Sequence, residues 1–139
     1  GQKSWEFLDQ MGYDMNLYTT MFSEMWVQEF SKKGGGHHSA HIHFNQHVSG
    51  LYFLKCSDKT SNPIFHDPKT GARATKLTMK PKQVILTGTD LVHFKPTPGT
   101  LIIFPGYLEH EFSVDHGLEP FRFIHWNIQA IPKGMAKGV

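Results

Sequence analysis

Hydrophobic and polar residues alternate along most of the chain in short runs, which are separated by Gly, Pro, Asn and Asp. Runs of this kind predict β-strands bounded by turns. One stretch differs, because Trp5, Leu8 and Met11 have the spacing of one helix face. A short helix is predicted there, with Ser4 as a possible N-cap and Gly12 as the stop. Beyond residue 21 nine strands are predicted: Met25–Phe30, His41–Phe44, Val48–Lys55, Pro63–Phe65, Lys76–Met79, Asp90–Phe94, Thr100–Phe104, Glu109–Val114 and Pro120–Ile128.

Nine strands without a helix long enough to connect parallel neighbours indicate antiparallel pairing. A length of 139 residues is typical of one domain with one core. We therefore expect a single all-β domain over residues 1–139, a jelly-roll barrel preceded by a short N-terminal helix.

Composition and charge exclude several classes of protein. The chain is 39% hydrophobic and 13% aromatic, which is enough apolar surface to exclude disorder as the main state. Its net charge is only +2 and it has no run of basic residues, so nothing points to a nucleic-acid or anionic-lipid partner. The single cysteine, Cys56, excludes an internal disulfide and fits a reducing compartment, so we expect a cytoplasmic protein.

The longest stretch without Asp, Glu, Lys or Arg covers residues 34–54, which is nominally long enough to span a membrane. It contains five histidines, Asn45, Gln46 and three consecutive glycines, all of them unfavourable in hydrocarbon. We therefore expect no membrane span. No positively charged start followed by an apolar run is present, so no secretory signal is predicted either.

Candidate chemistry concentrates in this histidine-rich stretch. Ten histidines spread evenly over the chain would place fewer than one in a window of 11 residues, but residues 37–47 hold five. If this segment is extended, His41, His43, Asn45 and His47 share one face. Two imidazoles at positions i and i+2 of a strand can bind one divalent metal ion. The alternative is that they are polar surface residues on a half-exposed strand.

Two further residues stand near the other end of the chain. His110 follows two Pro-Gly turns, at residues 98–99 and 105–106, which should hold it rigidly. Arg122 is the one permanently charged residue in an apolar strand, where a guanidinium needs an anion as partner. That anion could be a ligand carboxylate, or an internal one such as Asp67 or Glu109. Alternatively, the guanidinium could reach solvent along an edge of the sheet. Three histidine ligands on one face of an octahedral metal leave three positions open, which suits iron(II) binding a bidentate co-substrate and dioxygen.

These segments resemble the short 2-oxoglutarate- and iron(II)-dependent oxygenases of phages and bacteria. The resemblance rests on ordered stretches that together cover residues 22–129: WVQEFSKKGG from Trp26, HIHFNQHVSGLYFL from His41, IFHDP from Ile64, PGTLIIFPGYLEH from Pro98 and RFIHWN from Arg122.

This resemblance implies a double-stranded β-helix with iron near the mouth of the barrel and 2-oxoglutarate deeper inside. His110 would then be the distal metal ligand and Arg122 the anchor of the co-substrate's far carboxylate. Tyr52 and Asn127 would be further co-substrate contacts. The implied activity is hydroxylation of an unknown substrate, coupled to decarboxylation of 2-oxoglutarate to succinate.

The chain departs from the wider superfamily at the first ligand pair, which is usually His-x-Asp or His-x-Glu. We favour a metal site made of His41, His43 and His110. The alternatives are one of the paired histidines with Asp67 and His110, or a site that uses His43 and Asn45, whose neutral amide is a poor iron ligand.

Two other functions stay open. A cupin-type metal enzyme that does not use 2-oxoglutarate would share the spacing of His41, His43 and His110 but would not need Arg122. A jelly roll that only binds a ligand or a partner protein would need no metal. The sequence does not identify the hydroxylation substrate, for which peptide side chains, nucleic-acid bases and small metabolites are all possible.

Overall fold

The computed structural model describes residues 1–30, 33–80 and 85–136. Within them the elements are α1 (Gln2–Gln10), a 3-10 turn η1 (Met15–Leu17), β1 (Tyr18–Phe30), β2 (His38–His41), β3 (Val48–Lys55), β4 (Pro63–His66), α2 (Thr70–Ala74), β5 (Leu91–His93), β6 (Leu101–Pro105), β7 (His110–Phe112) and β8 (Phe121–Pro132).

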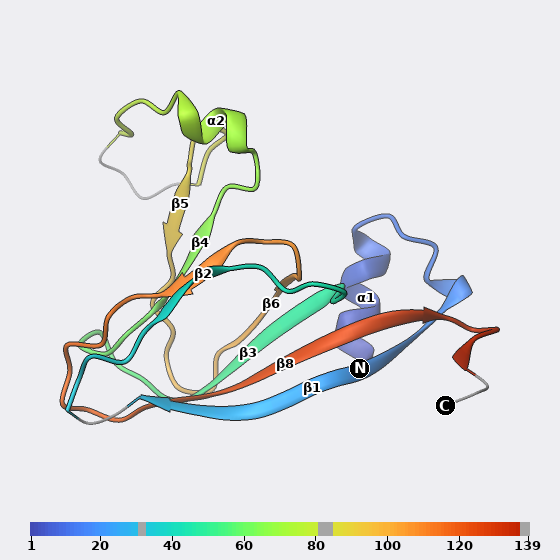
Figure 1. Ribbon diagram of the computed structural model, residues 1–139, viewed down its shortest axis with the longest axis horizontal. Helices are drawn as coiled ribbons and strands as arrows, with labels where there is room; N and C mark the ends of the chain where they lie inside the picture. Colours follow the sequence, from blue (N-terminus) through green and yellow to red (C-terminus); the bar gives the residue numbers. More distant parts are fainter. Residues whose placement is uncertain (31–32, 81–84, 137–139) are drawn as a thin grey trace.

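The strands form two four-stranded sheets, a large one in the order β1-β8-β3-β6 and a small one in the order β2-β7-β4-β5. All described strand pairs are antiparallel. In Figure 1 the small sheet crosses above β3 and β8, and β4, β5 and α2 project to one side of the body. This arrangement confirms the predicted all-β fold, a double-stranded β-helix with a short N-terminal helix.

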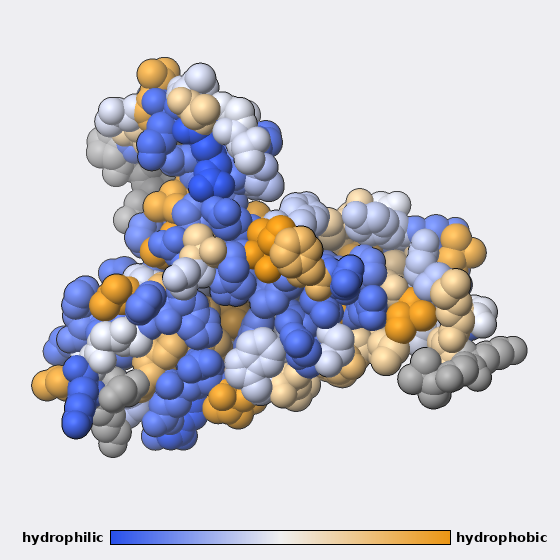
Figure 2. All heavy atoms as spheres, viewed as in Figure 1, coloured by the Kyte–Doolittle hydropathy of each residue, from blue (hydrophilic) through white to orange (hydrophobic). Residues whose placement is uncertain are grey.

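An aromatic core fills the space between the two sheets. Its buried members come from β1, β3, β6, β7 and β8 and their flanks: Phe30, Leu51, Phe53, Phe104, Phe112, Phe121 and Phe123. Figure 2 shows hydrophilic side chains over much of one face of the molecule, interrupted by separate hydrophobic patches. Burying a Phe or Leu side chain contributes about 1.5–3 kcal/mol, so this cluster contributes substantially to stability.

Strand register decides which residues of the large sheet face the small one, because residues directly opposite in antiparallel strands share a face. Two inward rows run across β3, β8 and β1. They are Ser49, Asn127 and Glu24 in one row, and Leu51, His125 and Trp26 in the next. The first of these rows consists of polar residues, whereas in the second the imidazole of His125 stands between the apolar side chains of Leu51 and Trp26.

Several predicted elements differ from the observed ones. β1 starts at Tyr18 instead of Met25, because it pairs with β8 along its whole length, with a bulge between Phe22 and Glu24. The strand predicted at residues 76–79 is wrong, since these residues are exposed and form no regular element. The short helix α2 was not predicted. No helix in the described ranges is both long and apolar enough to cross a membrane.

Candidate metal centre

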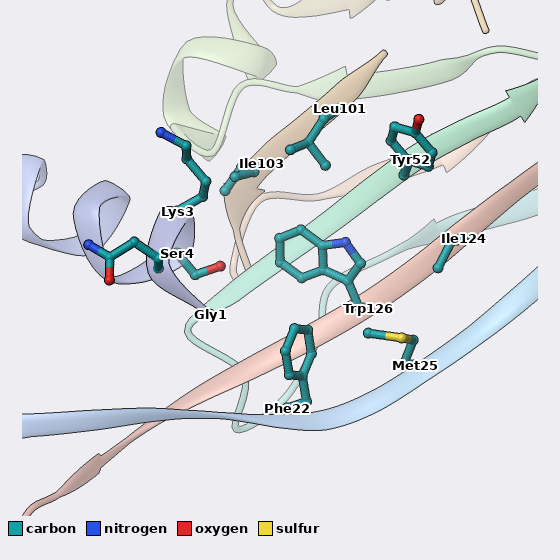
Figure 3. A pocket seen from close by; sticks show the side chains of 11 residues that line it. Gly1, Lys3, Ser4, Phe22, Met25, Tyr52, Leu101, Ile103, Ile124 and Trp126 are labelled. Atoms are coloured by element: carbon teal, nitrogen blue, oxygen red, sulfur yellow. The ribbon is translucent and has the colours of Figure 1, made fainter. Parts of the chain in front are cut away.

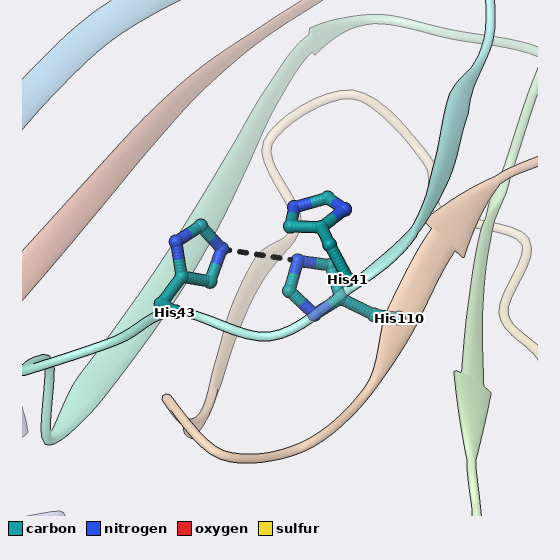
Figure 4. Close-up of side chains that lie close together, drawn as sticks. All are labelled: His41, His43 and His110. Carbon is teal, nitrogen blue, oxygen red and sulfur yellow. Dashed lines mark hydrogen bonds between the residues drawn. The ribbon is translucent and has the colours of Figure 1, made fainter.

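Three histidines meet between the two sheets. His41 ends β2, His43 follows two residues later, and His110 starts β7 directly opposite His41. One nitrogen of each ring lies within 4.8 Å of the corresponding atoms of the other two. The ring centroids are 4.5 Å apart for His41 and His110 and 5.1 Å apart for the other two pairs. Figure 4 shows the three rings converging, with His43 Nε2 3.2 Å from His110 Nε2.

Gly106 links the two segments that carry these histidines. Its carbonyl oxygen accepts a hydrogen bond from the backbone N–H of His43 (3.0 Å), and its own N–H donates to the carbonyl of His47 (3.1 Å). A Cβ at this position would lie 2.2 Å from the backbone oxygen of Gln46. Only glycine therefore allows the turn after β6 to approach the His43 segment so closely.

The expected alternation along residues 41–47 is only half right. β2 ends at His41, and the chain turns at Phe44 and Asn45, where Asn45 has a φ of 58°. His41 and His43 stay together, but the turn takes Asn45 out of the extended pattern that would have put it on the same face. His47 is held elsewhere, because its Nδ1 accepts a hydrogen bond from the backbone N–H of Ala130 (3.0 Å).

His110 is well suited to bind a metal through one nitrogen. It is 1% exposed, and its Nδ1–H donates to the carbonyl of Leu108 (2.8 Å), which leaves Nε2 as the ring's lone-pair nitrogen. Burial lowers the pKa of His110 to about 4, against a smaller raising effect of the Leu108 hydrogen bond. The ring is therefore neutral near pH 7, which is the form that binds metals.

Asn127 faces the same space but is engaged by the protein itself. Its Nδ2 donates to Glu24 Oε2 (2.9 Å) and lies 3.3 Å from His43 Nδ1, while its Oδ1 accepts a hydrogen bond from the Ser49 hydroxyl (2.6 Å). Burial, followed by the charge of His41, lowers the pKa of His43, and Glu24 opposes this effect. The amide of Asn127 thus lies against the ring of His43 and limits its position, a role that the sequence did not predict.

A fourth histidine, His125, was missed by the sequence analysis. It is 5% exposed, and its ring centroid lies 5.0 Å from that of His43 and 4.2 Å from that of Trp26. Burial lowers its pKa to about 3. The alternation of β8 could have identified it, because His125 shares the parity of the buried residues Phe121 and Phe123.

Arg122 lies at one of the alternate positions of β8 whose side chains point away from the small sheet. Its side chain is therefore on the outer face of the large sheet. It is ion-paired there with Glu29 of β1, and both side chains are more than a third exposed. The structure thus brings Arg122 together with neither the three histidines nor the internal partners considered for it, Asp67 and Glu109. Its position does not support the anchoring role that the resemblance implies.

Tyr52 also lies on the outer face. Figure 3 shows it with Trp126 and Ile124 at a cavity of about 440 Å³ that lies beside the start of α1. Within the described parts of β1, β3 and β8, the residues that face the histidines include no Lys or Arg. A cationic anchor for the co-substrate is therefore not found on these strands.

Asp67, the alternative metal ligand, stabilises the turn that follows it. Its Oδ1 accepts a hydrogen bond from the backbone N–H of Lys69 (2.8 Å), and its Oδ2 lies 3.6 Å from Lys69 Nζ. In the described residues, the grouping that could hold a metal consists of His41, His43 and His110. Three imidazole nitrogens suit a divalent transition metal such as iron(II) and leave coordination positions for further ligands.

Comparisons with known proteins identify similar folds and a family. The crystal structure of an oxidoreductase of the 2OG-Fe(II) oxygenase family from Burkholderia pseudomallei is similar, with a TM-score of 0.60 and 11% identity. The match covers 89% of this chain and 56% of that one, so the chain spans little more than half the length of that relative. At this identity the likeness shows the fold alone.

A cupin domain from Bordetella pertussis Tohama I has a TM-score of 0.43 and 14% identity, over 81% of this chain and 93% of that one. No curated protein matches the chain. The model of a family described as "Putative 2OG-Fe(II) oxygenase" matches residues 24–121, which is most of the chain. The protein therefore belongs to this family of oxygenases named for 2-oxoglutarate and iron(II).

Proposed function

We propose that the protein is a 2-oxoglutarate- and iron(II)-dependent dioxygenase that hydroxylates a C–H bond of a still unidentified substrate. The observation that carries the proposal is the convergence of His41, His43 and His110, each with one ring nitrogen within 4.8 Å of the others. Membership of the oxygenase family supports the same reaction class.

The residues of the chain would each contribute to holding the metal. His41, His43 and His110 would supply three nitrogen ligands. The Leu108 carbonyl fixes which nitrogen of His110 is available, and Asn127 restrains the ring of His43. Phe104, whose ring centroid is 4.7 Å from that of His110, helps to exclude water from one side of the site.

Iron(II) with 2-oxoglutarate would supply the oxidising chemistry, in which dioxygen, 2-oxoglutarate and a C–H bond give succinate, carbon dioxide and an alcohol. The sequence predicts Arg122, Tyr52 and Asn127 as contacts to 2-oxoglutarate. Of these three, only Asn127 faces the histidines. We also propose a cytoplasmic location, because Cys56 forms no disulfide.

Ligand-dependent stability tests this proposal. Melting temperatures are measured without oxygen for the protein alone, with iron(II), with 2-oxoglutarate and with both. We expect the largest rise with both together, because a ligand that binds only the folded state stabilises it by about 2.7 kcal/mol at 100 times its dissociation constant. The same ligands should leave the His110→Ala variant unchanged. If neither ligand shifts the wild-type protein, the dioxygenase proposal is wrong.

Two other functions predict different outcomes. A cupin-type metal enzyme would be stabilised by the metal but show no further effect of 2-oxoglutarate. A jelly roll that only binds a ligand or protein would respond to neither. The sequence predicts that Arg122 distinguishes a 2-oxoglutarate enzyme from a cupin-type enzyme. Because Arg122 lies on the outer face, direct measurement of 2-oxoglutarate binding has to make this distinction.

A further inference from the structure

His125 is a buried imidazole for which the metal site provides no role. Its Nε2 atom is buried and has no hydrogen-bond partner in the described residues. A buried polar nitrogen left in this state destabilises a fold, so such groups usually meet a ligand or another polar atom when the protein works. The contacts of its ring with His43 and Trp26 place this imidazole beside the metal centre.

Its surroundings suit the tail of a metal-bound acid. His125 stands in the inward row with Leu51 and Trp26, and this row lies directly after the row of Ser49, Asn127 and Glu24. The Glu24 carboxylate would repel a second carboxylate placed near its own row. An acidic tail extending from the metal would be less disfavoured in the row of His125, where an N–H donor in an apolar environment would make a strong hydrogen bond.

We propose that His125, and not Arg122, donates the hydrogen bond that holds the carboxylate of 2-oxoglutarate remote from the metal. This inference rests on the proposed function and identifies the residue that distinguishes 2-oxoglutarate from other 2-oxo acids. Arg122 lies three positions earlier on the same strand, with its side chain on the other face and paired with Glu29.

Binding to the manganese(II)-loaded protein without oxygen tests the inference, because affinity is read directly by calorimetry and needs no turnover. Two variants of β8 form a matched pair, His125→Phe on the inner face and Arg122→Ala on the outer face. Two ligands separate the roles: 2-oxoglutarate, and 2-oxopentanoate, which has the same carbon chain without the second carboxylate.

We expect His125→Phe to weaken 2-oxoglutarate binding about tenfold or more, the usual effect of losing a hydrogen bond to a charged group. The same variant should bind 2-oxopentanoate and manganese(II) as the wild type does. Arg122→Ala should change neither affinity by more than about twofold, as befits an exposed ion pair. His125→Gln, which keeps an N–H donor, should recover part of the lost affinity.

Three outcomes would overturn the inference. One is a large loss of 2-oxoglutarate affinity in Arg122→Ala with none in His125→Phe. Another is an equal loss for both 2-oxo acids in His125→Phe, which would mean that the ring only supports the fold. A third outcome, which does not depend on the folding of His125→Phe, is a loss of 2-oxoglutarate affinity well beyond twofold in Arg122→Ala. A wild-type protein that binds manganese(II) but neither acid would instead refute the dioxygenase proposal itself.

Discussion

The Nε2 atoms of His43 and His110 lie 3.2 Å apart, although 67 positions separate the two residues along the chain. Two nitrogens on neighbouring positions of one octahedral metal are about 3 Å apart when each metal–nitrogen bond is about 2.1 Å. The two rings are thus already at the separation that a shared metal requires. Little conformational entropy remains to be lost on binding, because His110 is buried and Gly106 holds the His43 segment.

Removing the most buried of the three rings should abolish metal binding. We expect His110→Ala to lose iron(II) or manganese(II), because two histidines on one short segment cannot replace the ligand from β7. Metal content after dialysis, measured by elemental analysis, checks this. His37→Ala is the control, since His37 is exposed and lies outside the group of ring nitrogens. Full metal occupancy in His110→Ala would exclude His110 as a ligand.

The contacts of Asn127 predict an effect on the metal without direct coordination. We expect Asn127→Ala to weaken metal binding by up to about tenfold, because the ring of His43 loses the amide that limits its position. The variant should also lose roughly 1–3 kcal/mol of stability, because the buried Ser49 hydroxyl loses its acceptor. Tyr52→Phe is a matched control on the outer face. Unchanged metal affinity in Asn127→Ala would show that His43 needs no such restraint.

Much of the fold was predictable because it depends on local alternation. The bounds of β3 are as predicted from the pattern of residues 48–55, and β4, β6 and β8 start within one residue of the expected position. The long first half of β1 was missed, since its exposed apolar residues Met21, Phe22 and Met25 blur the alternation. β2 was shifted because the turn at Asn45 requires a left-handed backbone, which asparagine adopts without a glycine to mark it.

The residues of the candidate metal site were predictable from local patterns of the same kind. His41 and His43 stand close in sequence, and His110 follows turns that Pro and Gly mark clearly. The alternation of inward and outward residues along β8 could also be read from the sequence. If Phe121 and Phe123 face the core, Arg122 faces away and His125 faces the core as well. The anchoring role of Arg122 came from the resemblance. A resemblance implies the chemical role of a residue but not the face of the sheet on which its side chain lies. The contact between Asn127 and Glu24 depends on pairing of β8 with β1 across 103 positions, which no local pattern shows.

Gly106 should be essential for the geometry of the metal centre. In Gly106→Ala the new Cβ would meet the backbone oxygen of Gln46 at 2.2 Å, and a backbone atom cannot rotate away. We expect a loss of roughly 1–3 kcal/mol of stability from this overpacking, together with weaker metal binding as the His43 segment shifts. Gly71→Ala in α2 is the control, because its Cβ would meet nothing within 4 Å. Urea denaturation and metal titration of both variants check this, and equal behaviour of the two would contradict it.

The buried histidines should make the metal-free protein sensitive to mild acid. The folded-state pKa values of His110 and His125 are lowered by burial to about 4 and about 3, against about 6.5 in the unfolded chain. Between these values the unfolded chain binds more protons, so the free energy of unfolding is highest above pH 6.5 and falls as the pH falls. Each histidine should contribute a slope of about 1.4 kcal/mol per pH unit.

Urea denaturation with a chelator present, at a series of pH values between 7 and 5, measures this slope before most carboxylates titrate. His125→Phe removes one of these groups, so its slope should be lower than that of the wild type by about 1.4 kcal/mol per pH unit. Stability that stays constant from pH 7 to pH 5 would mean that both imidazoles accept protons as readily in the folded as in the unfolded chain, and thus that neither is enclosed between the sheets.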